Sequence, residues 1–228
     1  MIAVDSAAAS HIADTIRSLH REIGEGVQLV AVSKFHPVEA LRAAYDAGQR
    51  LFGESRQQEL LQKIPLMPDD VAWHFIGHLQ TNKVKSIVGR VAMIESVDST
   101  RLLDTIQREA ARAGVVQNVL LQVHVAAEET KFGFDPDERM DYLASGQYKE
   151  MANVRLCGVM GMASNTDDAE RVSVDFRRIA DTFRRASAIV SDPGFRYISM
   201  GMSHDYPLAI AEGANLVRVG TMIFGQRG

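Results

Sequence analysis

The sequence of 228 residues has a single cysteine, Cys157, and this excludes an internal disulfide framework. Such sparse use of cysteine suits the reducing cytoplasm. Cys157 lies in the apolar stretch Leu156–Met160, which has the pattern of a strand. We therefore interpret it as a packed thiol and not as a nucleophile.

Long apolar runs and clusters of like charge are also missing. No stretch is long and apolar enough to cross a membrane, and Met1–Ser6 lacks the basic region and apolar core of a signal peptide. The formal net charge is −4 and no run is rich in lysine or arginine, which argues against a nucleic acid partner. With 46% hydrophobic and 24% charged residues, the composition predicts an ordinary globular protein of the cytoplasm.

What the sequence does contain is an alternation of short apolar runs with stretches in which apolar residues recur at helical spacing. An opening amphipathic helix is predicted from Ile12, Ile16, Leu19 and Ile23, before Gly24. A helical pattern follows each strand candidate. The strand candidates are Leu29–Ser33, Arg50–Gly53, Ala72–Ile76, Ala92–Ser96, Val119–Val125, Val154–Met160, Arg196–Ser199 and Asn215–Val219.

About eight strand–helix units in a chain of this length predict a closed (β/α)₈ barrel, the TIM barrel, with an extra N-terminal helix. The strands are short and mostly apolar, as parallel strands covered by helices are. An open doubly wound sheet is the alternative, because a strand count from one sequence can err by one or two. No linker or low-complexity stretch divides the chain, so we predict one domain over residues 1–228.

Lys34 directly follows the first apolar run, where a buried strand ends. The usual fate of such a lysine is to be solvated at the start of a loop. The apolar run leading to Lys34 would instead shield the amine from water and favour its use as a nucleophile. An amine in that setting is what an aldehyde cofactor needs to form an imine.

Two glycine motifs, Ser199–Ser203 and Val217–Thr221, fall at the ends of the last two predicted strands. The loops after strands seven and eight of such barrels often bind phosphate. Ser203 and Thr221 would supply hydroxyls, and Gly220 would let the backbone approach closely. Either glycine motif alone is more typical of a tight turn, but both together at these loops favour a phosphate site.

Arg218 lies inside the last apolar run, where an unpaired guanidinium would be too costly to bury. A ring nitrogen of a bound heterocycle could be its partner. A glutamate or aspartate is an equally good candidate from the sequence alone.

Two further patterns have simpler interpretations. Ser203, His204 and Asp205 are adjacent in sequence, and neighbours rarely adopt the geometry of a hydrolase triad. His74 and His78 have a spacing found among metal ligands, but no third ligand is near in sequence, so we predict no metal site.

Several of these residues belong to motifs by which the chain resembles the pyridoxal phosphate homeostasis proteins, the YggS-like or PROSC family. The resemblance covers the chain from about the first strand to the C-terminus. Its motifs are Ala31–Lys34, Phe52–Ser55, Trp73–Gly77 with Leu79–Lys83, Gly158–Met160, Ser199–Ser203 and Val217–Gly225.

The resemblance implies the barrel of the alanine racemase N-terminal domain and pyridoxal 5′-phosphate (PLP) as cofactor. Lys34 would form the internal aldimine. Arg218 would face the pyridine nitrogen and leave it unprotonated, which restrains quinonoid chemistry. Lys131 would lie near the phenolic oxygen. The cofactor-binding residues implied are Lys34, Ser55, Met160, Ser203, Arg218, Gly220 and Thr221.

Two departures from the family pattern stand out, because the family usually has Asn in place of Ser55 and Pro in place of His78. Ser55 can still form hydrogen bonds, so we expect altered contacts at the rim of the cofactor. The chain also lacks features of alanine racemase: the second, β-rich domain with its tyrosine base, and a histidine in Gly158–Ala163. A site with one base cannot readily remove a proton from one face and return it on the other.

We therefore expect a non-catalytic carrier that holds PLP as a reversible Schiff base and acts in vitamin B6 homeostasis. PLP-dependent apoenzymes are potential recipients, and a monomer or weak dimer is expected. One alternative is a weak amino-acid racemase or other Schiff-base enzyme. Another is a phosphosugar aldolase or isomerase, which would share the barrel and the phosphate loops.

Overall fold

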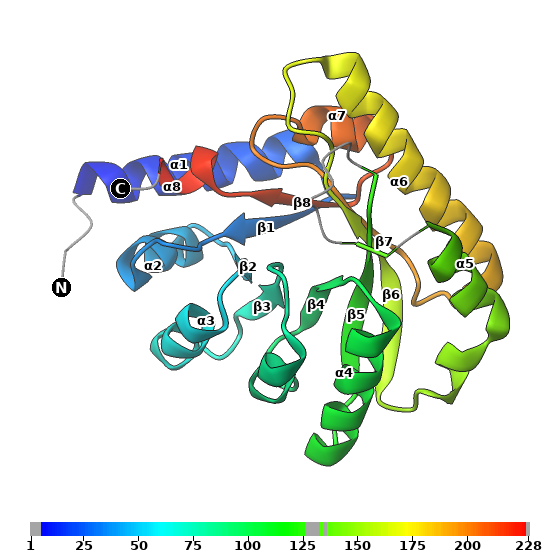
Figure 1. Ribbon diagram of the computed structural model, residues 1–228. Coiled ribbons are helices and arrows are strands. Elements are labelled where there is room, and N and C mark those ends of the chain that lie inside the picture. The colour runs from blue at the N-terminus through cyan, green and yellow to red at the C-terminus, as the bar shows by residue number, and fades with distance from the viewer. Residues whose placement is uncertain (1–5, 126–132, 135, 227–228) are drawn as a thin grey trace.

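The computed structural model describes residues 6–125, 133–134 and 136–226, without the side chains of residues 136–138. Its centre is a closed barrel of eight parallel strands in sequence order, in which β8 pairs with β1 (Figure 1). This confirms the (β/α)₈ barrel and excludes the open sheet, whereas a single domain over the whole chain stays a prediction. The strands are β1 (Gln28–Val32), β2 (Leu51–Glu54), β3 (Ala72–Phe75), β4 (Met93–Val97), β5 (Gln117–Val123), β6 (Val154–Gly161), β7 (Tyr197–Ser199) and β8 (Leu216–Val219).

All eight predicted strands are confirmed, with ends that differ by at most two residues. The largest difference is at β5, which begins with the polar residues Gln117 and Asn118. The Gln117 side chain is buried and donates to the carbonyls of Val91 and Asn118, so hydrogen bonds stabilise a polar side chain in a buried strand. Because Gln117 and Asn118 are polar, the apolar pattern predicted a strand that begins only at Val119.

Helices surround the barrel (Figure 1). The unit between β3 and β4 differs from the prediction, because among the described residues it has a 3₁₀ helix, η2, where an α-helix was expected. The helices are α1 (Ser6–Ile23), α2 (Val38–Asp46), α3 (Gln57–Lys63), η1 (Ile64–Leu66), η2 (Thr81–Ser86), α4 (Thr100–Ala113), α5 (Pro136–Ser145), η3 (Gln147–Glu150), α6 (Ala169–Val190), α7 (Tyr206–Ala211) and α8 (Thr221–Phe224).

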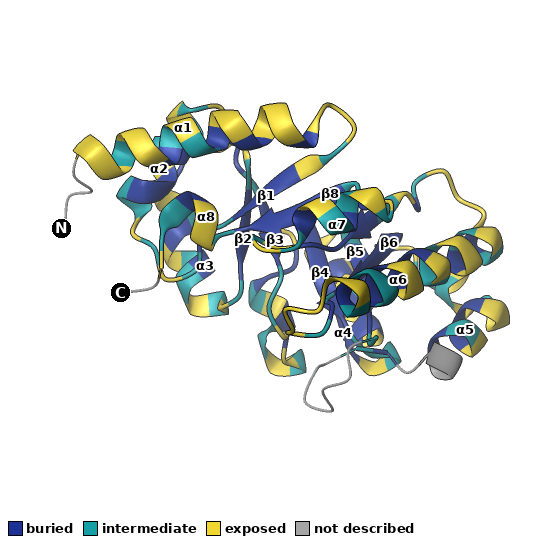
Figure 2. Ribbon diagram, turned by 90° about the horizontal axis from the view of Figure 1, so that it is seen from above, coloured by how far each residue is buried: buried dark blue, intermediate teal, exposed yellow. Residues whose placement is uncertain are grey.

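One of the predicted helix caps is confirmed at α4. Ser99, one of two predicted caps, accepts a hydrogen bond from the Leu102 N–H at the start of α4. The opening helix is also confirmed, since Ile12, Ile16 and Leu19 are buried on one face of α1. Figure 2 shows this face turned inward while the opposite face is exposed. Because α1 contacts both α2 and α8, it packs against the first and the last strand–helix units of the barrel.

The apolar core has two parts. The larger part lies between the strands and the helices. The smaller part fills the barrel interior with side chains such as Val30, Leu120 and Leu216. Cys157 belongs to this interior part, and burial raises the pKa of its thiol. A thiol that stays protonated is a poor nucleophile, which agrees with its interpretation as a packing residue.

Among the described residues, no helix is both long and apolar enough to span a lipid bilayer.

Candidate functional site

A cavity of about 200 Å³ lies at the end of the barrel where the carboxyl ends of the strands meet. We call it the upper cavity. Its wall is partly apolar, with Val32, Ile76 and Met162. Six of the seven predicted cofactor-binding residues line it and come from four strand ends: Lys34 after β1, Ser55 after β2, Ser203 after β7, and Arg218, Gly220 and Thr221 at the end of β8.

The backbone on both sides of Lys34 is held in place. Phe35 has a φ of 69°, a left-handed conformation that is uncommon for a residue other than glycine. Its N–H donates to Glu59 Oε1 at 2.6 Å. On the other side, the Ser33 carbonyl accepts from Lys63 Nζ at 2.8 Å. These contacts fix where the half-buried Lys34 side chain meets the upper cavity.

The contacts around Lys34 belong to what we call the outer network, Ser33, Glu54, Glu59 and Lys63, between the barrel and α3. Lys63 Nζ lies 2.7 Å from Glu54 Oε1 and 2.6 Å from Glu59 Oε1. The Ser33 hydroxyl also donates to Glu54 Oε1, at 2.6 Å. The other oxygen of Glu54 is buried without a hydrogen-bond partner. Burial raises the pKa of Glu54, although Lys63 and Ser33 oppose this.

The wall of the upper cavity beside β8 presents backbone N–H groups. The N–H groups of Gly220 and Met222 converge on the Ser203 hydroxyl oxygen, at 3.3 and 3.4 Å. A Cβ on Gly220 would lie 3.0 Å from the Val32 carbonyl oxygen, so a larger residue would crowd β1. The converging N–H groups and the hydroxyls of Ser203 and Thr221 suit the oxygens of a phosphate group.

Gly201 shapes the same wall from the β7–α7 loop. It has a φ of +91°, and a Cβ there would lie 2.6 Å from the Ala209 side chain. Only glycine fits such a conformation without strain. The Gly201 carbonyl accepts from the Arg218 N–H at 3.0 Å, which ties this loop to β8.

Arg218 finds its partners inside the barrel. Its Nη1 donates to the Ser199 hydroxyl at 2.6 Å and lies 3.8 Å from Glu95 Oε2, and its Nη2 donates to the Gly161 carbonyl at 2.9 Å. The carboxylate that the sequence left open as a partner is therefore Glu95. Burial lowers the pKa of Arg218, while the charges of Glu95 and Asp205 raise it.

Glu95 is fully buried and uses both carboxylate oxygens. His74 Nδ1 lies 2.6 Å from Oε1, and the Ser199 hydroxyl donates to Oε2 at 2.5 Å. Burial alone would raise the pKa of Glu95, but His74, Arg218 and Ser199 together lower it. We call His74, Glu95, Ser199 and Arg218 the interior network.

His74 and His78 therefore pair with different carboxylates, His74 with the buried Glu95 and His78 with Asp98. Four residues further on, His78 Nδ1 lies 3.0 Å from Asp98 Oδ2 on the exposed side of the barrel end. Among the described residues, no group of three His, Cys, Asp or Glu could hold a metal ion. Ser203 contacts backbone N–H groups, as a structural hydroxyl does, so its sequence neighbours do not make it a nucleophile.

The remaining predicted residues have different positions. Met160 lies deeper, in the apolar cluster of the barrel interior, and the side chain that reaches the cavity from beyond β6 is Met162. A cofactor contact for Met160 stays a prediction. Lys131 lies outside the described residues. The lining residues that were not predicted include two histidines, His204 and His36, and the His36 ring stacks on Phe224 with centroids 5.1 Å apart.

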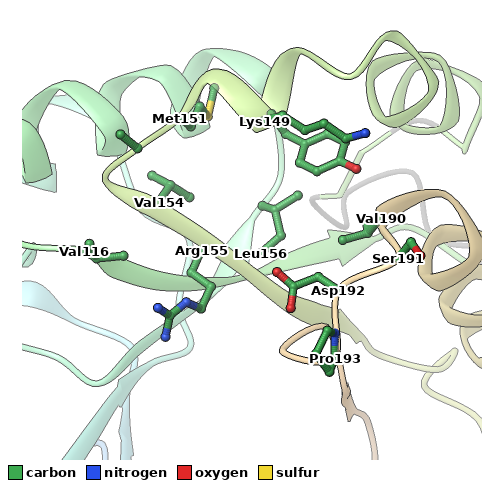
Figure 3. A pocket seen from close by; sticks show the side chains of 12 residues that line it. Val116, Lys149, Met151, Val154, Arg155, Leu156, Val190, Ser191, Asp192 and Pro193 are labelled. Atoms are coloured by element: carbon green, nitrogen blue, oxygen red, sulfur yellow. The ribbon is translucent and has the colours of Figure 1, made fainter.

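A larger cavity, of about 620 Å³, lies at the other end of the barrel, beside the start of β6 and the end of α6. Figure 3 shows its lining, which includes the apolar residues Leu156 and Val190 and the charged residues Lys149, Arg155 and Asp192. A second cavity at that end, of about 450 Å³, is lined by His74 and Cys157 among others. Size alone therefore does not mark the functional site, because the converging polar groups lie in the smallest of these three cavities.

Comparisons with known proteins show the family to which the chain belongs. The model of the alanine racemase N-terminal domain family matches residues 7–228. The pyridoxal phosphate homeostasis protein of Aquifex aeolicus is 38% identical over 225 residues, 96% of each chain. That of Schizosaccharomyces pombe is 42% identical over 220 residues, 94% of this chain and 91% of the relative. The chain belongs to the pyridoxal phosphate homeostasis protein family.

Solved structures show the same fold. PipY of Synechococcus elongatus PCC7942, solved with PLP bound, is 37% identical and superposes with a TM-score of 0.85 over 94% of this chain and all of PipY. Alanine racemase of Bartonella henselae is only 17% identical, with a TM-score of 0.74, and this chain covers 60% of it. That second likeness establishes the barrel architecture and carries no argument about activity.

Proposed function

We propose that this protein binds PLP reversibly, as a Schiff base on the Lys34 amine, and serves cytoplasmic PLP homeostasis without catalysis of its own. One observation carries the proposal. An amine at the end of β1 and a set of N–H and hydroxyl groups at the ends of β7 and β8 line the same cavity. Membership of a family whose PipY relative binds PLP supports it.

The residues of the cavity fit the parts of the cofactor. Gly220, Thr221 and Ser203 would hold the phosphate, because the N–H groups of Gly220 and Met222 already converge on the Ser203 hydroxyl and Thr221 lines the same cavity. Arg218 would face the ring nitrogen from the barrel interior, and Ser55 would lie at the rim. When bound, PLP supplies an aldehyde that an amine can capture and a ring that draws electrons from the captured group.

The environment of Arg218 favours storage of the cofactor over catalysis. A guanidinium that lies 3.8 Å from Glu95 stays charged, and a fixed cation does not donate its proton to a ring nitrogen. The ring would remain a weaker electron sink than one beside a carboxylic acid. Capture and release of the aldehyde need only the Lys34 amine, water and the phosphate wall.

The test is a comparison of the purified protein with a Lys34→Ala variant, each incubated with PLP. Wild-type protein is expected to absorb at roughly 420 nm, as PLP imines do. After borohydride reduction, peptide mass spectrometry should find the adduct on Lys34. Lys34→Ala should lose the band and the adduct, while Lys85→Ala, an exposed lysine of η2 that lies away from the upper cavity, should keep both. An adduct on another lysine in the wild type would overturn the proposal.

A second candidate function is weak amino-acid racemisation, and one observation favours it. His36 and His204 line the upper cavity with Lys34, so groups that can move a proton lie near the proposed imine. Incubation with several L-amino acids and PLP, followed by chiral chromatography, separates the two. Turnover well above that of free PLP, and lost in His36→Gln or His204→Gln, would establish the enzyme.

PLP-dependent apoenzymes are the recipients that this function would serve. Loaded protein should restore activity to such an apoenzyme faster than the same protein after borohydride reduction, which cannot release the cofactor. Equal rates would mean that the cofactor stays on Lys34. Size-exclusion chromatography across a range of concentrations tests the expected monomer or weak dimer.

A further inference from the structure

Four polar side chains from four strands cross the barrel interior in a connected series. They are the residues of the interior network, from β3, β4, β7 and β8. None is more than 5% exposed. The series begins at His74, which lines a cavity at the amino-terminal end of the barrel, and ends at Arg218 in the upper cavity. It therefore connects the two ends of the barrel through its centre.

The direction of each hydrogen bond in the interior network follows from its chemistry. The guanidinium of Arg218 can only donate, so the Ser199 hydroxyl oxygen accepts from it and gives its own proton to Glu95. An ionised Glu95 can only accept, so His74 Nδ1 must carry a proton. Each group has one role that its neighbours allow.

Apolar side chains would fill the interior of a barrel at a lower cost in desolvation than these four groups. A neighbouring part of the interior is an apolar cluster that includes Val30, Met93, Leu120 and Leu216. The polar interior network ends at Arg218, the cation that would face the proposed cofactor. A guanidinium is flat, and anchoring Nη1 on Ser199 and Nη2 on Gly161 fixes its plane.

We propose that Glu95 is a positioning residue for Arg218, and that His74 in turn holds Glu95, so that two side chains remote from the cofactor set its contact at the ring nitrogen. This inference rests on the proposed function of the upper cavity. It assigns to His74 and Glu95 a role in recognising the ring nitrogen of PLP, through Arg218, beyond their contribution to stability.

Two compounds separate this role from a structural one: PLP, and its analogue with CH in place of the ring nitrogen. Glu95→Gln should weaken PLP binding about tenfold, the size of loss seen when outer partners of metal ligands are removed. His74→Gln should weaken it less, because it acts through Glu95. The analogue has no ring nitrogen, so its affinity should change less than about twofold in either variant. A similar loss for both compounds, or for neither, would overturn the inference.

A matched control is available in the same region of the chain. His78→Gln breaks a similar histidine–carboxylate pair on the exposed side of the barrel end and should leave both affinities unchanged. If Glu95→Gln fails to fold, Ser199→Ala removes the hydroxyl that links Arg218 to Glu95. It is expected to weaken the binding of PLP but not of the analogue.

A readout without cofactor keeps the inference apart from the proposed function. In nitrogen-15 NMR of the unliganded protein, an anchored Arg218 should give resolved guanidinium N–H signals. These should merge in Glu95→Gln, because the Ser199 hydroxyl then loses the carboxylate that orients it and no longer holds Nη1 in place. Unchanged signals would overturn the positioning role even if PLP binds. If wild-type protein binds neither compound but the signals merge, the proposed function fails and the positioning of Arg218 stands.

Discussion

Glu54 and Glu95 are two fully buried carboxylates behind the same cavity, but their pKa values move in opposite directions. Burial raises the pKa of Glu54, which uses one oxygen for its contacts and leaves the other without a partner. At Glu95, partners on both oxygens outweigh burial and lower the pKa. Burial alone therefore does not set the direction of a carboxylate's pKa shift; the balance between burial and the partners does.

The two networks also act on different parts of the site. The outer network contacts backbone atoms on either side of Lys34, through Ser33 and Phe35. The interior network contacts the Arg218 side chain itself. A lysine that must capture and release an aldehyde needs a fixed backbone and a mobile amine. A guanidinium that recognises a ring nitrogen needs a fixed side chain.

The strongest test of the comparison is Lys63→Met in the outer network. It would leave Glu54 and Glu59 without their cation, and we expect a loss of about 3–5 kcal/mol in the free energy of unfolding. Urea denaturation followed by circular dichroism measures it. The double variant Glu54→Gln with Lys63→Met should recover part of the loss. A double variant no more stable than Lys63→Met would show that the buried charge of Glu54 is not the cause.

A smaller effect is expected from Ser199→Ala in the interior network. The change leaves Arg218 and Glu95 facing each other without the bridging hydroxyl, and we expect a loss of about 1–3 kcal/mol. Thermal unfolding, with Ser164→Ala of the β6–α6 loop as a comparison hydroxyl outside the upper cavity, would measure it. Greater stability of Ser199→Ala would mean that direct pairing of the two charges is better than the bridged form.

The opposite pKa shifts predict opposite slopes of stability with pH. The raised pKa of Glu54 contributes stability below its unfolded-state pKa, and this is lost as pH rises through the folded-state value. The lowered pKa of Glu95 contributes stability above its unfolded-state pKa, and this is lost as pH falls through the folded-state value. Between pH 3 and 7, Glu54→Gln should therefore remove a fall in stability with rising pH, and Glu95→Gln should remove a rise. Slopes of the same sign would refute the contrast.

The smallest effect is expected at the exposed pair of His78 and Asp98. Its side chains are partly solvated, so His78→Ala should change the free energy of unfolding by only about 0.2–1 kcal/mol. The same measurement on His74→Ala should give a clearly larger loss, because that histidine pairs with a fully buried carboxylate. Equal losses would mean that burial does not separate these two pairs.

Much of the fold was predictable because buried parallel strands leave short apolar runs in the sequence. That Lys34 and the two glycine motifs lie at one end of the barrel was predictable for a related reason, since each is at the end of such a run. Glu95 was missed although a signal existed. It is an acidic residue in the middle of the apolar run Met93–Val97, and the buried Arg218 required an acidic partner.

Other features could not be read from local patterns. Met162 reaches the cavity in place of Met160 because β6 continues to Gly161, and its pairing with β5 shifts register between Val119 and Leu120. The link from Lys63 to Ser33 joins residues of different elements. Only the packing of α3 against the barrel brings them together.

The pairing of β1 with β8 has a consequence for synthesis on the ribosome. The amine that would capture the cofactor emerges with the first strand, and the groups that would hold its phosphate and ring emerge with the last. A nascent chain therefore cannot retain the aldehyde until translation of the barrel is complete, so unfinished copies would not drain the cell's supply of the vitamin.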